Sequence, residues 1–182
     1  KGMTAEYLLL RTFKVKKGDT ILFHAAAGGV GLIAGQWAKH LGATTIGTVG
    51  SAEKVKLARA YGFDHVINYR EQDFVEEVRK ITGGKLCEVV YDSVGKDTFE
   101  GSLNCLKPLG LLALFGQSSG PVPPFNLGVL AQKGSLYVTR PTLFVYNAKR
   151  EDLEKSAGAL FEVVKSGAVR IEVNQRYKLS DA

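Results

Sequence analysis

Short apolar runs alternate along the chain with longer stretches in which apolar residues recur at helical spacing. Brief apolar runs are typical of parallel strands that are buried on both faces. Such strands are expected at residues 20–24, 44–49, 65–68, 88–93, 111–115 and 135–139. Strands that alternate with helices in this way predict an α/β fold with a doubly wound parallel sheet flanked by helices.

The stretches between these runs each carry one apolar face, which predicts amphipathic helices. Ser51 is expected to cap one of them, and Gly83 with Gly84 is expected to end another. Residues 116–124 are rich in glycine and proline near their end and are predicted to form a loop. The helical segments lie at 4–11, 30–41, 51–61, 74–81, 98–106 and 151–165, and a further strand-like segment covers 170–173.

The most informative segment is FHAAAGGVG at residues 23–31, where an apolar run ends, a glycine turn follows and a helical pattern begins. This order predicts a dinucleotide-binding turn, although Ala26 stands where the usual pattern has its first glycine. Gly28 would let the backbone approach a pyrophosphate, and Gly31 would let the helix pack close to the strand. The free N–H groups at the helix start would then face the phosphates. The alternative is a glycine turn that binds no ligand.

The end of the second predicted strand indicates which cofactor is bound. NAD-binding domains usually place Asp or Glu there to hold the ribose hydroxyls, whereas this chain has no acid at that tip. Gly50 leaves space, Ser51 offers a hydroxyl and Lys54 offers a cation, which favours the 2′-phosphate of NADP(H). Tyr69 could flank the same phosphate. Glu53 opposes this interpretation, and Lys54 and Tyr69 could instead be ordinary surface residues.

Several polar residues invite a catalytic interpretation that the pattern does not support. Asp92 ends a predicted strand, and we expect it to cap a loop rather than to react. His24 precedes the glycine turn on an apolar strand, and we expect a packed core histidine rather than a proton donor. His40 and His65 show no metal-ligand spacing with either cysteine. The sequence therefore predicts no metal site, and no catalytic residue is assigned.

With 182 residues the chain can bury one good core and suits a single domain. Its net charge of +6 could indicate nucleic acid, but Lys and Arg are scattered, which favours a solvated basic surface. We find no signal peptide and no apolar run near 18 residues, so neither secretion nor a membrane span is predicted. Cys87 and Cys105 are expected to be buried thiols, which is typical of a reducing, cytoplasmic compartment.

Six motifs together resemble the NADPH:quinone oxidoreductases, a zinc-free branch of the medium-chain dehydrogenase/reductase superfamily. The resemblance covers nearly the whole chain. The motifs are AAAGGVG (25–31), GTVGSAEK (47–54), VINYR (66–70), VYDSVG (90–95), FGQSSG (115–120) and KGSLYVTRP (133–141).

The resemblance implies a six-stranded Rossmann domain that binds NADP(H) and takes part in hydride transfer to a quinone. It also implies a preceding GroES-like catalytic domain, so residues 1–182 would be the cofactor domain of a longer enzyme. A homodimer would form through the strand from Ser135 to Thr139. The resemblance places the 2′-phosphate on Gly50, Lys54 and Tyr69, the pyrophosphate along Ala27, Gly28, Gly29 and Val30, and the nicotinamide beside Thr4, Phe115 and Gly116.

Two other functions stay open. A zinc-free NADPH-dependent reductase of activated alkenes, such as an enone or enal, would share every cofactor residue named above. A non-catalytic nucleotide- or RNA-binding module is the other alternative. Scattered basic residues and the lack of an aromatic platform on adjacent strands argue against it.

Overall fold

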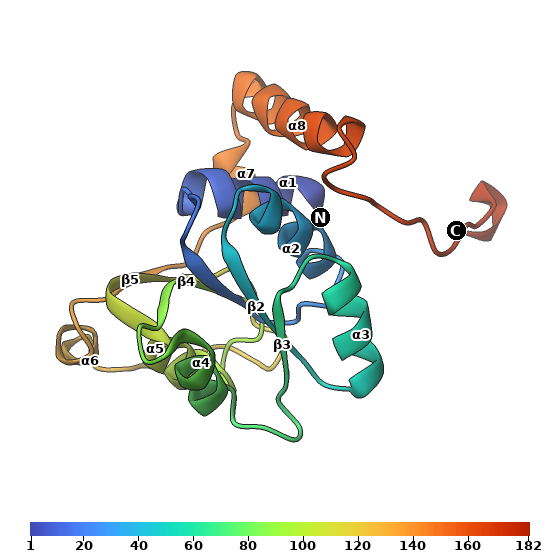
Figure 1. The fold of residues 1–182 in the computed structure, drawn as a ribbon. Coiled ribbons are helices and arrows are strands. Elements are labelled where there is room, and N and C mark those ends of the chain that lie inside the picture. The colour runs from blue at the N-terminus through green and yellow to red at the C-terminus, as the bar shows by residue number, and fades with distance from the viewer.

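Six parallel strands form the centre of the computed structural model, which describes residues 1–182 (Figure 1). The strands lie side by side in the order β3-β2-β1-β4-β5-β6, and every neighbouring pair is parallel. This order confirms the predicted doubly wound sheet and is that of a Rossmann domain. The strands are β1 (Thr20–Phe23), β2 (Thr44–Val49), β3 (His65–Asn68), β4 (Cys87–Asp92), β5 (Leu106–Leu114) and β6 (Tyr137–Thr139).

Helices cover both faces of this sheet. Figure 1 shows α1, α2 and α8 on one side and α4 and α5 on the other, and α1 contacts both α2 and α8. The helices are α1 (Gly2–Glu6), α2 (Gly31–His40), α3 (Ala52–Ala60), α4 (Phe74–Thr82), α5 (Phe99–Asn104), α6 (Gly128–Gln132), α7 (Leu143–Tyr146) and α8 (Arg150–Lys165). A π-helical turn (Tyr7–Thr12) extends α1, and a 3₁₀ turn (Leu179–Asp181) lies near the C-terminus.

The apolar strands are buried because alternate residues enter two separate cores. Ile21 and Phe23 of β1 join the core beneath α1 and α2, whereas Leu22 between them joins the core beneath α4 and α5. Side chains alternate between the faces of a strand, so a sheet that is covered on both faces needs apolar residues at every position. This requirement explains the unbroken apolar runs in the sequence.

Two predicted helix ends are confirmed. The Ser51 hydroxyl accepts a hydrogen bond from the Lys54 backbone N–H at 3.3 Å, as expected of a helix cap. Gly83 ends α4 with a φ of 58°, in the left-handed region that favours glycine. No helix is both long and apolar enough to span a bilayer, and both cysteines are buried free thiols.

Several element predictions are wrong in detail. Residues 170–173 form no strand, and the short helices α6 and α7 were not predicted. β6 begins at Tyr137 rather than Ser135, because Ser135 has a φ of 56° that an extended strand excludes. β5 begins at Leu106, five residues earlier than expected, and its pairing with β4 shifts register. Leu109 lies in this irregular part with a φ of 62°.

Candidate cofactor site

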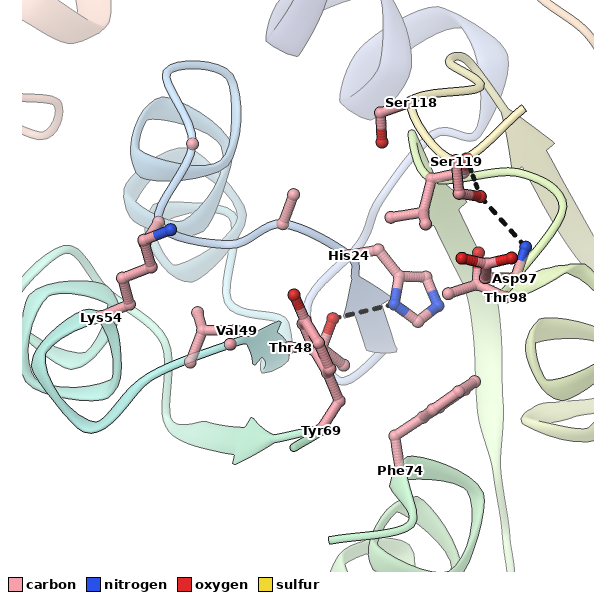
Figure 2. Close-up of a pocket in the computed structure, with 15 residues that line it drawn as sticks. His24, Thr48, Val49, Lys54, Tyr69, Phe74, Asp97, Thr98, Ser118 and Ser119 are labelled. Carbon is pink, nitrogen blue, oxygen red and sulfur yellow. Dashed lines mark hydrogen bonds between the residues drawn. The ribbon is translucent and has the colours of Figure 1, made fainter. Parts of the chain in front are cut away.

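A cavity of about 630 Å³ lies at the carboxyl ends of the strands (Figure 2). Its lining comes from the turn after β1, the tip of β2 and the segments that follow β3, β4 and β5. The winding of the sheet changes direction between β1 and β4, and ligands of open α/β sheets bind at such a switch point. The topology therefore places the cavity where a dinucleotide site is expected.

One end of the cavity, which we name the cationic end, consists of Gly50, Lys54 and Tyr69. A Cβ atom on Gly50 would lie 2.6 Å from the Tyr69 hydroxyl oxygen, so this hydroxyl rests directly against the backbone at the tip of β2. None of the six salt bridges includes Lys54, and Tyr69 is 53% exposed. The cationic end thus holds a positive charge without a partner in the chain.

The glycine turn borders the same cavity through Ala27 and Gly28. The next three backbone N–H groups, those of residues 29–31, donate to no acceptor in the chain. A Cβ atom on Gly31 would lie 2.4 Å from the Ala26 carbonyl oxygen, so only glycine fits at this position without a steric clash. The turn therefore leaves three backbone N–H groups without an acceptor at the start of α2, and such groups bind anions.

The opposite side of the cavity, which we name the far wall, follows β4 and β5. The Ser119 hydroxyl links the segment after β5 to the segment after β4. It accepts from the Asp97 N–H at 3.1 Å and donates to the Val94 carbonyl at 2.8 Å. The sequence predictions missed this wall, although the switch-point rule points to the residues after these strands. Figure 2 shows it across from Lys54 and Tyr69, with His24 between them; its residues are Val94, Asp97, Thr98, Ser118 and Ser119.

Four residues at the floor of the cavity are linked in series by side-chain hydrogen bonds, and we name them the buried polar chain. They are Thr48, His24, Ser102 and Asp92, all at most 1% exposed. The His24 ring bonds Thr48 Oγ1 through Nδ1 at 2.8 Å and Ser102 Oγ through Nε2 at 3.0 Å. Ser102 in turn donates to Asp92 Oδ2 at 2.8 Å. Burial lowers the pKa of His24, and the charge of Asp92 opposes this shift.

Asp92 also holds the turn that follows β4. Its Oδ1 accepts from the N–H groups of Val94 and Gly95 at 2.8 and 3.1 Å, and its Oδ2 accepts from the Thr98 hydroxyl at 2.7 Å. The expectation that Asp92 caps a loop is therefore confirmed. The expectation that His24 is a packed core residue is confirmed as well, and the structure adds a hydrogen bond at each ring nitrogen.

The predicted site residues divide into two groups. Ala27, Gly28, Gly50, Lys54 and Tyr69 line the cavity. The others do not line it: Ser51 caps α3, Val30 and Gly29 lie at the start of α2, Phe115 and Gly116 follow β5, and Thr4 lies on α1. Phe115 packs against Phe23, with ring centroids 5.5 Å apart.

Fold and site together define a Rossmann-type dinucleotide-binding domain. The chain belongs to the zinc-binding dehydrogenase family, whose model matches residues 29–162. The donor set of this chain does not fit a zinc ion, because no three His, Cys, Asp or Glu side chains come together to hold one.

The chain is similar to quinone oxidoreductases, which confirms the resemblance seen in the motifs. It is 58% identical to the quinone oxidoreductase of Salmonella typhimurium over the whole chain, which spans 56% of that relative. A 2-haloacrylate reductase of a Burkholderia species is 50% identical and is spanned to 55%. The structure of Escherichia coli quinone oxidoreductase with NADPH matches 94% of this chain and 53% of that one, with a TM-score of 0.92 and 56% identity.

Proposed function

We propose that this chain binds NADPH and is the cofactor domain of a longer, cytoplasmic enzyme that reduces a quinone. The observation that carries the proposal is the unpaired Lys54 ammonium at the cationic end of the cavity. A cation without a partner beside a glycine turn suits the extra phosphate that distinguishes NADPH from NADH. The similarity to NADPH-bound quinone oxidoreductase supports the same choice.

The residues divide the work of binding along the cofactor. Lys54 and the Tyr69 hydroxyl hold the 2′-phosphate by charge and hydrogen bonding, while Ser51 starts α3 beside them. The free N–H groups of Gly29, Val30 and Gly31 bind the diphosphate. No acid stands at the tip of β2 itself, and Glu53 in the first turn of α3 does not line the cavity, so no carboxylate of the lining at this end faces the 2′-phosphate.

The bound cofactor supplies a hydride from its nicotinamide ring, and the protein supplies orientation and electrostatics. Thr4, Phe115 and Gly116 border the nicotinamide in this proposal. Phe115 and Gly116 directly follow β5, and both of their N–H groups donate to the Asp92 carbonyl, so their backbone is tied to the end of β4. The side chains that polarise the acceptor lie in the part of the enzyme outside this chain.

The deciding experiment measures cofactor binding and turnover on the full protein. Calorimetric titration with NADPH and NADH is expected to show tighter binding of NADPH, by the charge-assisted bonds at the cationic end. Steady-state assays with a quinone acceptor are expected to show NADPH consumption. Equal affinity for both cofactors, or no turnover of any quinone, would contradict the proposal.

Reduction of an activated alkene is the second candidate. The observation that favours it is the 50% identity to a 2-haloacrylate reductase, since that protein shares the cofactor domain. Side-by-side turnover of a quinone, an enone and a 2-haloacrylate discriminates the two candidates. A kcat/KM for the alkene above that for the quinone would favour alkene reduction.

We also propose that the protein is a homodimer joined through β6. β6 pairs only with β5 and forms one edge of the sheet, so its outer N–H and C=O groups lack partners in the sheet. Tyr137 on this edge is 61% exposed. Two copies paired antiparallel about a two-fold axis would cover both edges with one self-complementary contact.

Val138→Pro tests this interface, because proline removes a ladder donor and resists a paired strand. Light scattering is expected to show a dimer for the wild type and a monomer for the variant. Val138→Ala is the matched control, since it keeps the N–H group and should stay dimeric. A monomeric wild type at high micromolar concentration would refute the dimer, and a dimeric proline variant would locate the contact elsewhere.

A further inference from the structure

The buried polar chain connects two parts of the cavity that are far apart in the sequence. Thr48 lies two residues before Gly50 of the cationic end, and its carbonyl also accepts from the N–H of Ala26 in the glycine turn at 3.0 Å. Asp92 is the last member of the buried polar chain, and it accepts the hydrogen bonds that hold the turn of the far wall. His24 is the residue that joins these two ends, through Thr48 and Ser102.

In the buried polar chain every hydrogen bond has one possible direction of donation. A carboxylate only accepts, so the single hydroxyl proton of Ser102 points to Asp92. Ser102 must then accept from His24, which places the ring proton on Nε2 and leaves Nδ1 as the acceptor for the Thr48 hydroxyl. Each of these polar atoms has one orientation that satisfies all its neighbours. Such fully satisfied networks are rigid.

The ring of His24 is also held from the side. The Phe74 ring lies edge-on to it, with centroids 5.0 Å apart and planes at 88°. Both residues line the cavity, so the ring is a part of its floor and not only of the core (Figure 2). A side chain fixed by two hydroxyls and one aromatic ring has little freedom to shift.

The geometry points to His24 as a positioning residue that fixes the cationic end and the far wall at the separation the cofactor requires. This inference rests on the proposed function, because the ligand whose binding reports the separation is NADPH. It predicts that Thr48 and Ser102 affect NADPH binding through one another, although no hydrogen bond joins them directly. Loss of either hydroxyl breaks the connection, and loss of the second then adds little.

The test is a double-mutant cycle in the full protein, with Kd for NADPH as the readout. Thr48→Val and Ser102→Ala are each expected to weaken binding about 5-fold, and the double variant also about 5-fold rather than about 25-fold. In a His24→Leu background, whose side chain can neither donate to Ser102 nor accept from Thr48, this coupling should disappear. The melting temperature of every variant is measured without ligand.

A matched control pair separates positioning from general stability. Thr45 is a second buried hydroxyl on β2, but it bonds the Gly62 carbonyl and the Asp64 carboxylate instead of His24. Thr45→Val combined with Ser102→Ala should therefore show independent effects on Kd, even where the melting temperature falls as much. Coupling of the control pair would show that the effect is general loss of rigidity and would overturn the inference.

The remaining outcomes are distinct for the two proposals. A wild type that does not bind NADPH contradicts the proposed function and removes the basis of this inference. A wild type that binds NADPH, with independent effects of Thr48→Val and Ser102→Ala or with no effect of either, overturns the positioning role of His24 alone.

Discussion

The cationic end and the buried polar chain belong to one cavity but differ in how their polar groups are satisfied. Lys54 forms no salt bridge, and Tyr69 is largely exposed. In the buried polar chain, by contrast, each side chain is hydrogen-bonded within the protein. An unpaired exposed charge costs little without a ligand and is free to bind one, whereas an unpaired buried group would destabilise the fold. The difference predicts separate effects on binding and on stability.

The glycine turn borders the same cavity, and a substitution there has the largest expected effect on cofactor binding. Gly28→Val should abolish binding of NADPH and NADH, because the new side chain occupies space at the cavity where the phosphates lie. Isothermal titration checks this, with circular dichroism to confirm folding. Gly158→Val is the control, since a Cβ on Gly158 meets no atom within 4 Å. Normal binding by the Gly28 variant would make this segment a plain turn.

Removing the carboxylate of the buried polar chain should affect stability most. Asp92→Ala leaves four buried or half-buried donors without their acceptor and should lower the free energy of unfolding by about 3–5 kcal/mol. Denaturant unfolding measures this loss. Asp97→Ala, an exposed acid in the same turn, should cost about 0.5 kcal/mol or less. A similar cost for both variants would remove the contrast between the two regions.

Removing the charge of the cationic end should instead affect cofactor selectivity. Lys54→Ala is expected to weaken NADPH binding by about 1–3 kcal/mol, the value of a lost charge-assisted hydrogen bond, and to leave NADH binding nearly unchanged. Titrations of wild type and variant with both cofactors give the ratio of the NADPH and NADH dissociation constants. Lys56→Ala, on the same helix but outside the cavity lining, should change neither affinity. Equal losses for the two cofactors would refute the role of Lys54.

The smallest expected effect is the pH dependence that His24 contributes. Its pKa in the folded protein lies below the ordinary value of 6.5 because burial disfavours the charged ring. Below pH 6.5 the unfolded chain therefore takes up a proton that the native protein does not. His24 thus makes the free energy of unfolding fall by at most about 1.4 kcal/mol per pH unit as the pH drops towards the lowered pKa.

Denaturant unfolding between pH 7.5 and 5 compares the wild type with His24→Asn. The variant should lose less stability on acidification, because it lacks a histidine that the unfolded chain protonates while the pKa of the buried ring keeps it neutral in the folded protein. Identical pH profiles for the two proteins would show that burial does not keep His24 neutral.

The order of elements and the Gly50–Lys54 part of the cationic end could be predicted because both depend on local sequence, whereas the pairing of β2 with β3 brings Tyr69 to Gly50. The apolar runs predicted all six strands, and only β5 and β6 have starts displaced by two or more residues, where the backbone enters the left-handed region at Leu109 and Ser135. The cap at Ser51 and the turn at Gly28 follow from residues within one helical turn. Such features need only neighbouring residues to form, so their signals survive in the sequence.

The far wall and the buried polar chain were decided by the tertiary structure. His24 is 78 residues from Ser102 in the chain, and Asp97 is 22 residues from Ser119, yet each pair is hydrogen-bonded. The parallel sheet brings them together because it aligns the carboxyl ends of β1, β4 and β5 at one edge. The sequence determined which residues could bind an anion and which would be buried. Only the folded sheet determined that buried hydroxyls, an imidazole and a carboxylate would satisfy one another beneath the cofactor cavity, because only the sheet brings these distant segments within hydrogen-bonding distance.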